Sequence, residues 1–549
     1  MNVAAKFVPV TNALDAAARG LALPPSVAKL WIFGAIALLV IGLAVRVAPL
    51  AEPHGRQLRE FPTEDGYLML TIARNLAIGK SMSVADGEQL TNGTQPLATI
   101  LWAAAFGVAG GDRVDGVRNV LVLEILFSLV AVFALYRLLR SVLHELALPR
   151  EVALFTAAAW FASAAAIPHA MNCLETGLYA LVVIWVFAVF LSPASDREFS
   201  LKRSLGLGAL LGLVFWARND SVFLILAVCV SHLARPLLYG TSTVLRRFKE
   251  SLVFGGLSVV IAAPWLIYNK VNFGSIVPIS GQSESMGAEL GGNLVKIPAS
   301  LLEYLFIVFP VPARLETSLW VAVPAAVICL GALAVLFARR AQLGPQLRLL
   351  VLAGGIFGGL LCAYYGLLFG AGWFVARYMF PLSPLLVIPG ACVLGRYVAP
   401  RTAWAAVAIS LTVLLCARLG LRIHMNGAQH QHFQVVEWVA EYVPEDVWIG
   451  SPQSGTVGFY HDRTLNLDGK VNPIALAARQ RDPAGGVHKY MVERGVQYFV
   501  DWASQIGWAQ HPVLAPHFKV LVHDVAQNLV VLQRHGAPIL KPVDPPLPR

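Results

Sequence analysis

Long runs of apolar residues, separated by short polar segments, fill the chain from about residue 28 to about residue 420. Residues 30–45, 117–135, 178–191 and 349–369 are examples, each near the roughly 20 residues that a helix needs to cross a bilayer. The pattern predicts a polytopic α-helical membrane protein with about eleven spans. We place the spans at residues 28–50, 117–136, 152–171, 174–192, 204–217, 221–237, 251–268, 318–337, 349–370, 378–395 and 402–420.

Two further apolar runs are too short to cross a membrane. Residues 96–109 open with Pro96, and residues 301–312 contain Pro310 and Pro312. We expect each run to form a re-entrant or interfacial element, so that neither changes the side on which the following loops lie.

Composition and charge placement agree with this topology. Of the 549 residues 57% are hydrophobic and 13% charged, whereas about a quarter are charged in soluble proteins. The net charge is +10, and the alternating spans place the basic clusters of the short loops on one side, which predicts cytoplasmic loops and an inner-membrane protein and disfavours nucleic-acid binding. These clusters are Arg137 and Arg140, Lys202 and Arg203, Arg246, Arg247 and Lys249, Arg339 and Arg340, and Arg396 and Arg401.

The start of the chain, its cysteines and its tail add three further expectations. Residues 1–29 contain no short apolar stretch before a small-residue cleavage site, so a cleaved signal peptide is not expected. The six cysteines lie in or beside the apolar runs and indicate neither a disulfide framework nor a zinc site. From about residue 421 to 549 no run can span a membrane, which predicts a small extracytoplasmic α/β domain after a transmembrane domain at 1–420.

Within this tail, local patterns predict particular elements. Residues 432–442 have helical spacing, residues 447–450 read as a strand, and residues 490–500 read as a helix, a glycine cap and a strand. Residues 541–549 are proline-rich, and we expect them to be unstructured.

Ionisable and polar residues near the ends of the spans all fall on the outer side of this topology. A charge close to membrane depth is costly and usually faces a cavity or a partner, so these residues predict one outer pocket, although ordinary loop charges would explain them too. They are Glu64 and Asp65 in the first outer loop (51–116), Asn172 and Glu175, Arg218 and Asp220, Lys270, and Arg377.

The chemistry of such a pocket can be argued from residue types. Arg218, Arg377 and Lys270 could hold a phosphate, and a carboxylate among them could accept the proton of an attacking hydroxyl. Trp373 and Tyr378 flank Arg377 and could offer an aromatic face to a sugar ring or an isoprenoid tail. The alternative for these two is the aromatic belt of the membrane interface.

Five motifs follow one another along the chain. They are Glu64-Asp65-Gly66-Tyr67 with Ala73-Arg74-Asn75-Leu76 and Gly93-Thr94-Gln95-Pro96-Leu97, then Asn172-Cys173-Leu174-Glu175-Thr176, Ala217-Arg218-Asn219-Asp220, Pro264-Trp265 with Phe273-Gly274 and Pro278, and Trp373 to Arg377-Tyr378 with Pro381. In this order they resemble bacterial GT-C glycosyltransferases, and most nearly the mycobacterial terminal arabinofuranosyltransferases. The sequence departs from the family pattern at Gln95, Ala98 and Asn269, and in lacking a lysine near Gln282 and Ser283.

The resemblance implies an enzyme that transfers a hexose or pentose from a polyprenyl-phosphate donor to a hydroxyl of a cell-envelope glycan, lipid or protein. It implies that Asp65 is the general base and that Glu64 positions the acceptor or a divalent cation. The donor would be bound by Arg218, Arg377, Lys270, Asn172, Glu175, Asp220, Trp373 and Tyr378.

Two other classes fit part of the pattern. A transporter or lipid flippase would explain the spans and charges, but the chain shows no paired internal repeat and carries an outer domain of about 125 residues. A binding or scaffold protein that has lost catalysis is disfavoured by the intact Glu64-Asp65 pair.

Overall fold

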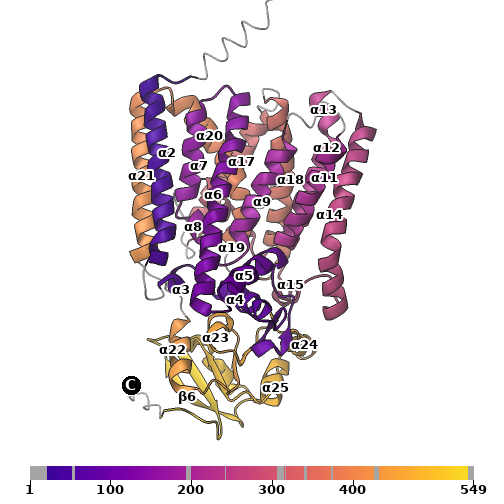
Figure 1. Cartoon of the computed structure of the whole chain (residues 1–549), viewed down its shortest axis with the longest axis vertical. Helices are drawn as coiled ribbons and strands as arrows, with labels where there is room; N and C mark the ends of the chain where they lie inside the picture. The colour runs from indigo at the N-terminus through magenta and orange to yellow at the C-terminus, as the bar shows by residue number, and fades with distance from the viewer. Residues whose placement is uncertain are drawn as a thin grey trace, which may run out of the picture.

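The computed structural model is a bundle of roughly parallel helices with a smaller domain at one end, which we call the domain end (Figure 1). It describes residues 22–51, 56–192, 200–240, 243–305, 315, 317–338, 343–372, 375–425 and 432–541. The polytopic helical class predicted from the apolar runs is confirmed. By length and composition, six segments of the described chain can cross a membrane: Pro25–Ala51, Arg113–Glu145, Val244–Phe273, Pro345–Leu368, Val375–Val398 and Thr402–Ile423.

The bundle is built from long helices and shorter apolar ones. α2 (Pro25–Val47) packs on α21 (Thr402–Met425) at one edge, and α11 (Leu201–Ala217) packs on α14 (Val244–Phe273) at the other (Figure 1). The remaining helices of the bundle are α6 (Arg113–Glu145), α7 (Arg150–Ala162), α8 (Ala166–Ala170), α9 (Thr176–Phe190), α12 (Val222–Leu233), α13 (Arg235–Tyr239), α17 (Leu319–Ala338), α18 (Pro345–Ala363), α19 (Val375–Met379) and α20 (Ser383–Val393).

Two of the predicted spans are interrupted. The span placed at 152–171 breaks after α7, where the Ser163 hydroxyl accepts a hydrogen bond from the backbone N–H of Ala165 (3.1 Å) and so replaces the helical ladder. The span placed at 221–237 breaks at Ala234, because Pro236 has no N–H to continue the hydrogen bonds of α12. Such local breaks are invisible to a count of apolar residues.

The domain end carries the elements of residues 51–116, which we call the first polar loop. α4 (Glu64–Ala77) is capped by the Thr63 hydroxyl, which accepts from the N–H of Gly66 (3.1 Å). α5 (Pro96–Val108) lies beside α4 at this end (Figure 1). The other elements here are α3 (Arg56–Glu60), the hairpin of β1 (Ser83–Val84) and β2 (Gln89–Leu90), α15 (Ile279–Ser285) and α16 (Ile297–Leu305). The rest of the apolar run expected at 301–312 lies outside the described residues.

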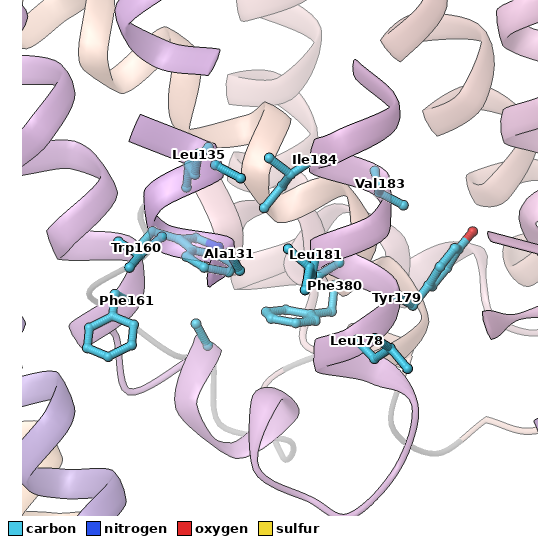
Figure 2. Close-up of a cluster of buried hydrophobic side chains, with 14 of the residues drawn as sticks. Ala131, Leu135, Trp160, Phe161, Leu178, Tyr179, Leu181, Val183, Ile184 and Phe380 are labelled. Carbon is cyan, nitrogen blue, oxygen red and sulfur yellow. The ribbon is translucent and has the colours of Figure 1, made fainter. Parts of the chain in front are cut away.

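A buried aromatic contact fixes the segment that follows α18. Trp160 of α7 stacks on Phe380 (6.1 Å between ring centroids), and its indole N–H donates to the hydroxyl of Ser383 (2.9 Å). Figure 2 shows these rings among apolar side chains of α6 and α9, including Leu135 and Ile184. The packing holds α19 and its Arg377 in place at the domain end.

The C-terminal domain is a small α/β unit, as expected. Its described strands form a five-stranded sheet in the order β4-β3-β5-β7-β6, in which β4, β3 and β5 are parallel and β7 and β6 antiparallel. The helix expected at 432–442 is α22 (Phe433–Tyr442), and the strands expected near 447–450 and 496–500 are β3 (Ile449–Ser451) and β5 (Tyr498–Asp501). The other elements are α23 (Gly455–Tyr460), β4 (Thr464–Asn466), α24 (Pro473–Arg481), α25 (Gly486–Glu493), β6 (Phe518–Asp524) and β7 (Leu529–Arg534). Residues 542–549 lie outside the described residues.

The C-terminal domain packs directly on the first polar loop. Arg113, at the start of α6, donates to the Phe459 carbonyl (2.7 Å) and pairs with Asp462 (2.8 Å). Backbones also meet without side chains between them: a Cβ atom at Gly93 would lie 2.0 Å from the carbonyl oxygen of Lys470, and one at Gly455 would lie 2.0 Å from that of Glu64. Glycine is therefore required at both contacts.

We expect Gly93→Ala to destabilise the protein by about 1–3 kcal/mol, because the added methyl group meets backbone that cannot turn away. Gly107→Ala is the matched control: Gly107 lies in α5 with nothing within 4 Å of an added Cβ, and the change favours the helix. Thermal unfolding of the purified full-length variants measures the difference. Equal unfolding temperatures for the two variants would contradict the close docking of the domain.

Candidate active site

An ion pair between two helices forms the centre of the site. Arg377 in α19 places one guanidinium nitrogen 2.7 Å from Oδ2 of Asp65, in the first turn of α4. A second guanidinium nitrogen donates to the hydroxyl of Tyr378 (3.0 Å). The Asp65 side chain keeps 28% of its surface exposed, so its carboxylate is held in place and remains accessible.

A lysine from the C-terminal domain joins this pair. Nζ of Lys470, in the loop between β4 and α24, lies 3.9 Å from Oδ1 of Asp65 and 2.8 Å from Oε1 of Glu284 in α15. Burial would raise the pKa of Asp65, but the charges of Arg377 and Lys470 and the Arg377 hydrogen bond lower it to about 2. Burial would lower the pKa of Lys470, but its acidic neighbours raise that pKa above the usual range. Both groups are therefore ionised at neutral pH.

A second charged cluster lies deeper in the bundle. Arg218, at the end of α11, lies 2.9 Å from Glu175 and 3.0 Å from Asp220, and donates to the Tyr365 hydroxyl (2.8 Å). The Tyr365 hydroxyl in turn donates to Asp220 (2.5 Å). The side chain of Arg218 is only 6% exposed, so its charge depends on these partners.

The ring of Tyr378 connects the two clusters. Its centroid lies 5.0 Å from the guanidinium carbon of Arg377 and 5.1 Å from that of Arg218. Tyr365 stacks on the same ring at 4.5 Å. Tyr378 is therefore buried between its neighbours and braces the two arginines, which differs from the open aromatic face expected for a sugar.

The structure brings together six residues that the sequence singled out as one pocket. These are Asp65, Glu175, Arg218, Asp220, Arg377 and Tyr378. Trp373 lies outside the described residues. Lys270 is exposed near the end of α14 and donates to the carbonyl of Gly274, the residue that caps this helix (2.8 Å).

Asn172 and Glu64 have structural contacts. The Asn172 side-chain oxygen accepts from the N–H of Leu174 (3.1 Å), and its amide donates to the Thr176 hydroxyl (3.0 Å), which holds the turn before α9. The Glu64 carboxylate accepts hydrogen bonds from the N–H groups of Gly455 and Thr456 (3.0 Å for Thr456) and from the Thr456 hydroxyl (2.5 Å). Glu64 thus holds the first turn of α23 and docks the C-terminal domain beside Asp65.

Sequence reasoning missed Lys470, Glu284 and Tyr365. Tyr365 lies in an apolar run, and Glu284 follows the stretch near Gln282 where the sequence departs from the family pattern. A signal for Lys470 existed, since it follows the polar turn that ends β4. Its proximity to Asp65, however, depends on how the domain docks.

The carboxylates of the site are paired with cations: Asp65 with Arg377, Glu284 with Lys470, and Glu175 and Asp220 with Arg218. In the described part of the chain, no three His, Cys, Asp or Glu side chains come close enough to hold a metal ion. The arrangement places a carboxylate beside two cations, and such a set can hold an anion and accept a proton.

Known proteins share this architecture. ArnT from Cupriavidus metallidurans, in a crystal structure with undecaprenyl phosphate bound, matches with a TM-score of 0.56 and 14% identity over 90% of this chain and 97% of that chain. The Archaeoglobus fulgidus oligosaccharyltransferase tethered with an acceptor peptide matches with a TM-score of 0.51 and 12% identity over 88% of this chain and 72% of that chain. The chain therefore has the GT-C fold expected from its motifs.

The C-terminal domain matches a family of its own. Residues 422–534 match a family described as a domain of unknown function, DUF8728. No curated protein matches the sequence.

Arg218→Met should destabilise the protein by about 3–5 kcal/mol, because it leaves the carboxylates of Glu175 and Asp220 buried without a counter-charge. Arg494→Met is the control: Arg494 pairs with Glu88 between the C-terminal domain and the first polar loop, but both side chains are more than a third exposed, and less than about 1 kcal/mol is expected. Thermal unfolding in detergent compares them. A mild effect at Arg218 would mean that the deep cluster does not hold the bundle together.

Proposed function

We propose that this protein is a glycosyltransferase that moves a sugar from a polyprenyl-phosphate donor to a hydroxyl of a cell-envelope glycan, lipid or protein. The observation that carries the proposal is the accessible, deprotonated carboxylate of Asp65 held between Arg377 and Lys470 at one end of a GT-C bundle. The undecaprenyl phosphate bound to ArnT, which shares the fold, supports a lipid phosphate as the donor carrier.

We infer a role for each group from this geometry. The acceptor oxygen attacks the anomeric carbon, Asp65 takes the hydroxyl proton, and the bond from that carbon to the phosphate oxygen breaks with its electron pair on the departing polyprenyl phosphate. Arg377 holds the phosphate through its two-pronged guanidinium. Arg218 braces Arg377 through Tyr378, because its own donors are engaged by Glu175, Asp220 and Tyr365.

We infer the orientation in the membrane from the charges at the two ends of the helices. α6 starts at the C-terminal domain with Arg113 and carries Arg137 and Arg140 toward its other end. α14 carries Arg246 and Arg247 in its first turn and bonds to the first polar loop at its last turns through Asn269 and Asn92 (3.0 Å). Arg137, Arg140, Arg246 and Arg247 therefore lie away from the site, which supports a bacterial inner-membrane protein with its site and C-terminal domain in the periplasm.

Within this class we propose a hexosyl or pentosyl transfer like that of the mycobacterial terminal arabinofuranosyltransferases, whose motif order the chain resembles. The division of the chain into a catalytic membrane domain at 1–420 and a periplasmic domain at 421–549 is part of the proposal, with α21 continuing to Met425.

Asp65→Asn should lower turnover roughly 100-fold to 10,000-fold, because the amide keeps the shape of the side chain but cannot accept the proton. The measurement is transfer of radiolabelled sugar from membrane lipid to an envelope acceptor. Asp86→Asn in the same loop is the matched control, since Asp86 pairs with Lys80 away from the site. Near-normal transfer by a folded Asp65→Asn protein would remove Asp65 as the base.

Glu64→Gln tests the neighbouring carboxylate in the same assay. It should lower the unfolding temperature, because Glu64 docks α23, with a smaller effect on turnover per folded molecule than Asp65→Asn.

Arg377→Lys should raise the KM for the lipid-linked donor by about tenfold or more, because lysine keeps the charge but cannot bind Asp65, Tyr378 and a phosphate from one planar group. Arg494→Lys, outside the site, should leave this KM unchanged. Unchanged donor KM in both Arg377→Lys and Arg377→Ala would exclude Arg377 as a phosphate ligand.

A further inference from the structure

The loop that carries Lys470 is built rigidly and fastened to the membrane domain. Asn466 accepts from the N–H of Gly469 (3.0 Å), and Asp468 accepts from the N–H of Lys470 itself (2.9 Å). The Asp468 carbonyl accepts hydrogen bonds from the Ser283 hydroxyl (2.8 Å) and from Arg479. The close backbone approach of Lys470 to Gly93 adds a second fixed point. The position of the ammonium group is thus set by two parts of the chain far apart in sequence.

Two cations converge on the carboxylate of Asp65. Arg377 approaches Oδ2 and Lys470 approaches Oδ1, from the membrane domain and the C-terminal domain respectively. The Lys470 side chain is 27% exposed, so its ammonium can reach a bound molecule. Its nearer partner is Glu284, which balances its charge but leaves two of the three ammonium hydrogens to point elsewhere.

We propose that Lys470, supplied by the C-terminal domain, binds the donor's phosphate together with Arg377, so that this domain completes the donor site. The inference rests on the proposed function and extends it to the DUF8728 domain. A lipid phosphate placed over Asp65 meets one point-charge donor and one two-pronged donor, which is a favourable set for a phosphodiester group.

Donor binding then also activates the base. A carboxylate with a pKa of about 2 is ionised but accepts a proton weakly. When the phosphate binds Arg377 and Lys470, its negative charge offsets the two cations that lower the pKa of Asp65. The carboxylate of Asp65 then becomes more basic. A bound donor therefore favours proton transfer to Asp65.

The test uses the purified full-length protein in lipid nanodiscs and undecaprenyl phosphate, without sugar, as the probe. Intrinsic tryptophan fluorescence gives the apparent Kd, and thermal unfolding shows that each variant is folded. Lys470→Met should weaken binding about tenfold or more, and Lys470→Arg should restore most of it. Lys489→Met is the matched control, because Lys489 lies in the same domain but pairs with Asp482 at the surface.

Glu284→Gln shows whether Lys470 contacts the phosphate or only holds the C-terminal domain in place through its pair with Glu284. It frees Lys470 from its nearest carboxylate, so the probe should bind as tightly as to the native protein or more tightly. Equal affinity of Lys470→Met and native protein, or a loss in Glu284→Gln as large as in Lys470→Met, would overturn the role of Lys470. If the native protein does not bind the probe, the proposed function itself is overturned. If Arg377→Lys weakens binding but Lys470→Met does not, the proposed function stands and only the role of Lys470 is rejected.

Discussion

The contact between Asp65 and Arg377 joins the parts of this protein that the site requires. Asp65 begins a helix of the first polar loop, and Arg377 belongs to a short helix held by the Trp160–Phe380 stack inside the bundle. Two charges at the boundary of an apolar bundle are stable only when paired, so their pairing fixes α4 against α19. The 2.7 Å contact keeps a carboxylate and a guanidinium ready at one accessible point.

The C-terminal domain extends this arrangement and is fastened by backbone contacts. Glu64 holds the first turn of α23, while Gly455 and Gly93 allow backbones to meet without side chains. Two adjacent residues of one loop therefore make different contacts. Glu64 binds the C-terminal domain, and Asp65 faces Lys470 of that domain. The sequence suggests a catalytic role for both carboxylates of this acidic pair. In the structure Glu64 anchors the C-terminal domain, and Asp65 is the proposed base.

The deep cluster around Arg218 is linked to the Asp65–Arg377 pair through the ring of Tyr378. Arg218 is engaged by Glu175, Asp220 and Tyr365, and the ring of Tyr378 lies between Arg218 and Arg377. The guanidinium of Arg218 thus supports the Asp65–Arg377 pair from inside the bundle. Lys270 and Asn172, which we expected at the donor, each bond to the backbone of their own segment, and their roles in donor binding stay predictions.

The sequence by itself determined the membrane class, the GT-C fold and the tail domain, because apolar run length, charge alternation and motif order are local properties of the chain. It also placed Asp65, Arg218 and Arg377 on one side, since the side of each loop or span end follows from counting the spans. Only the tertiary structure decided which charges meet. The docking of Glu64 on α23 and the approach of Lys470 to Asp65 depend on packing between distant segments, which no local pattern of residues encodes.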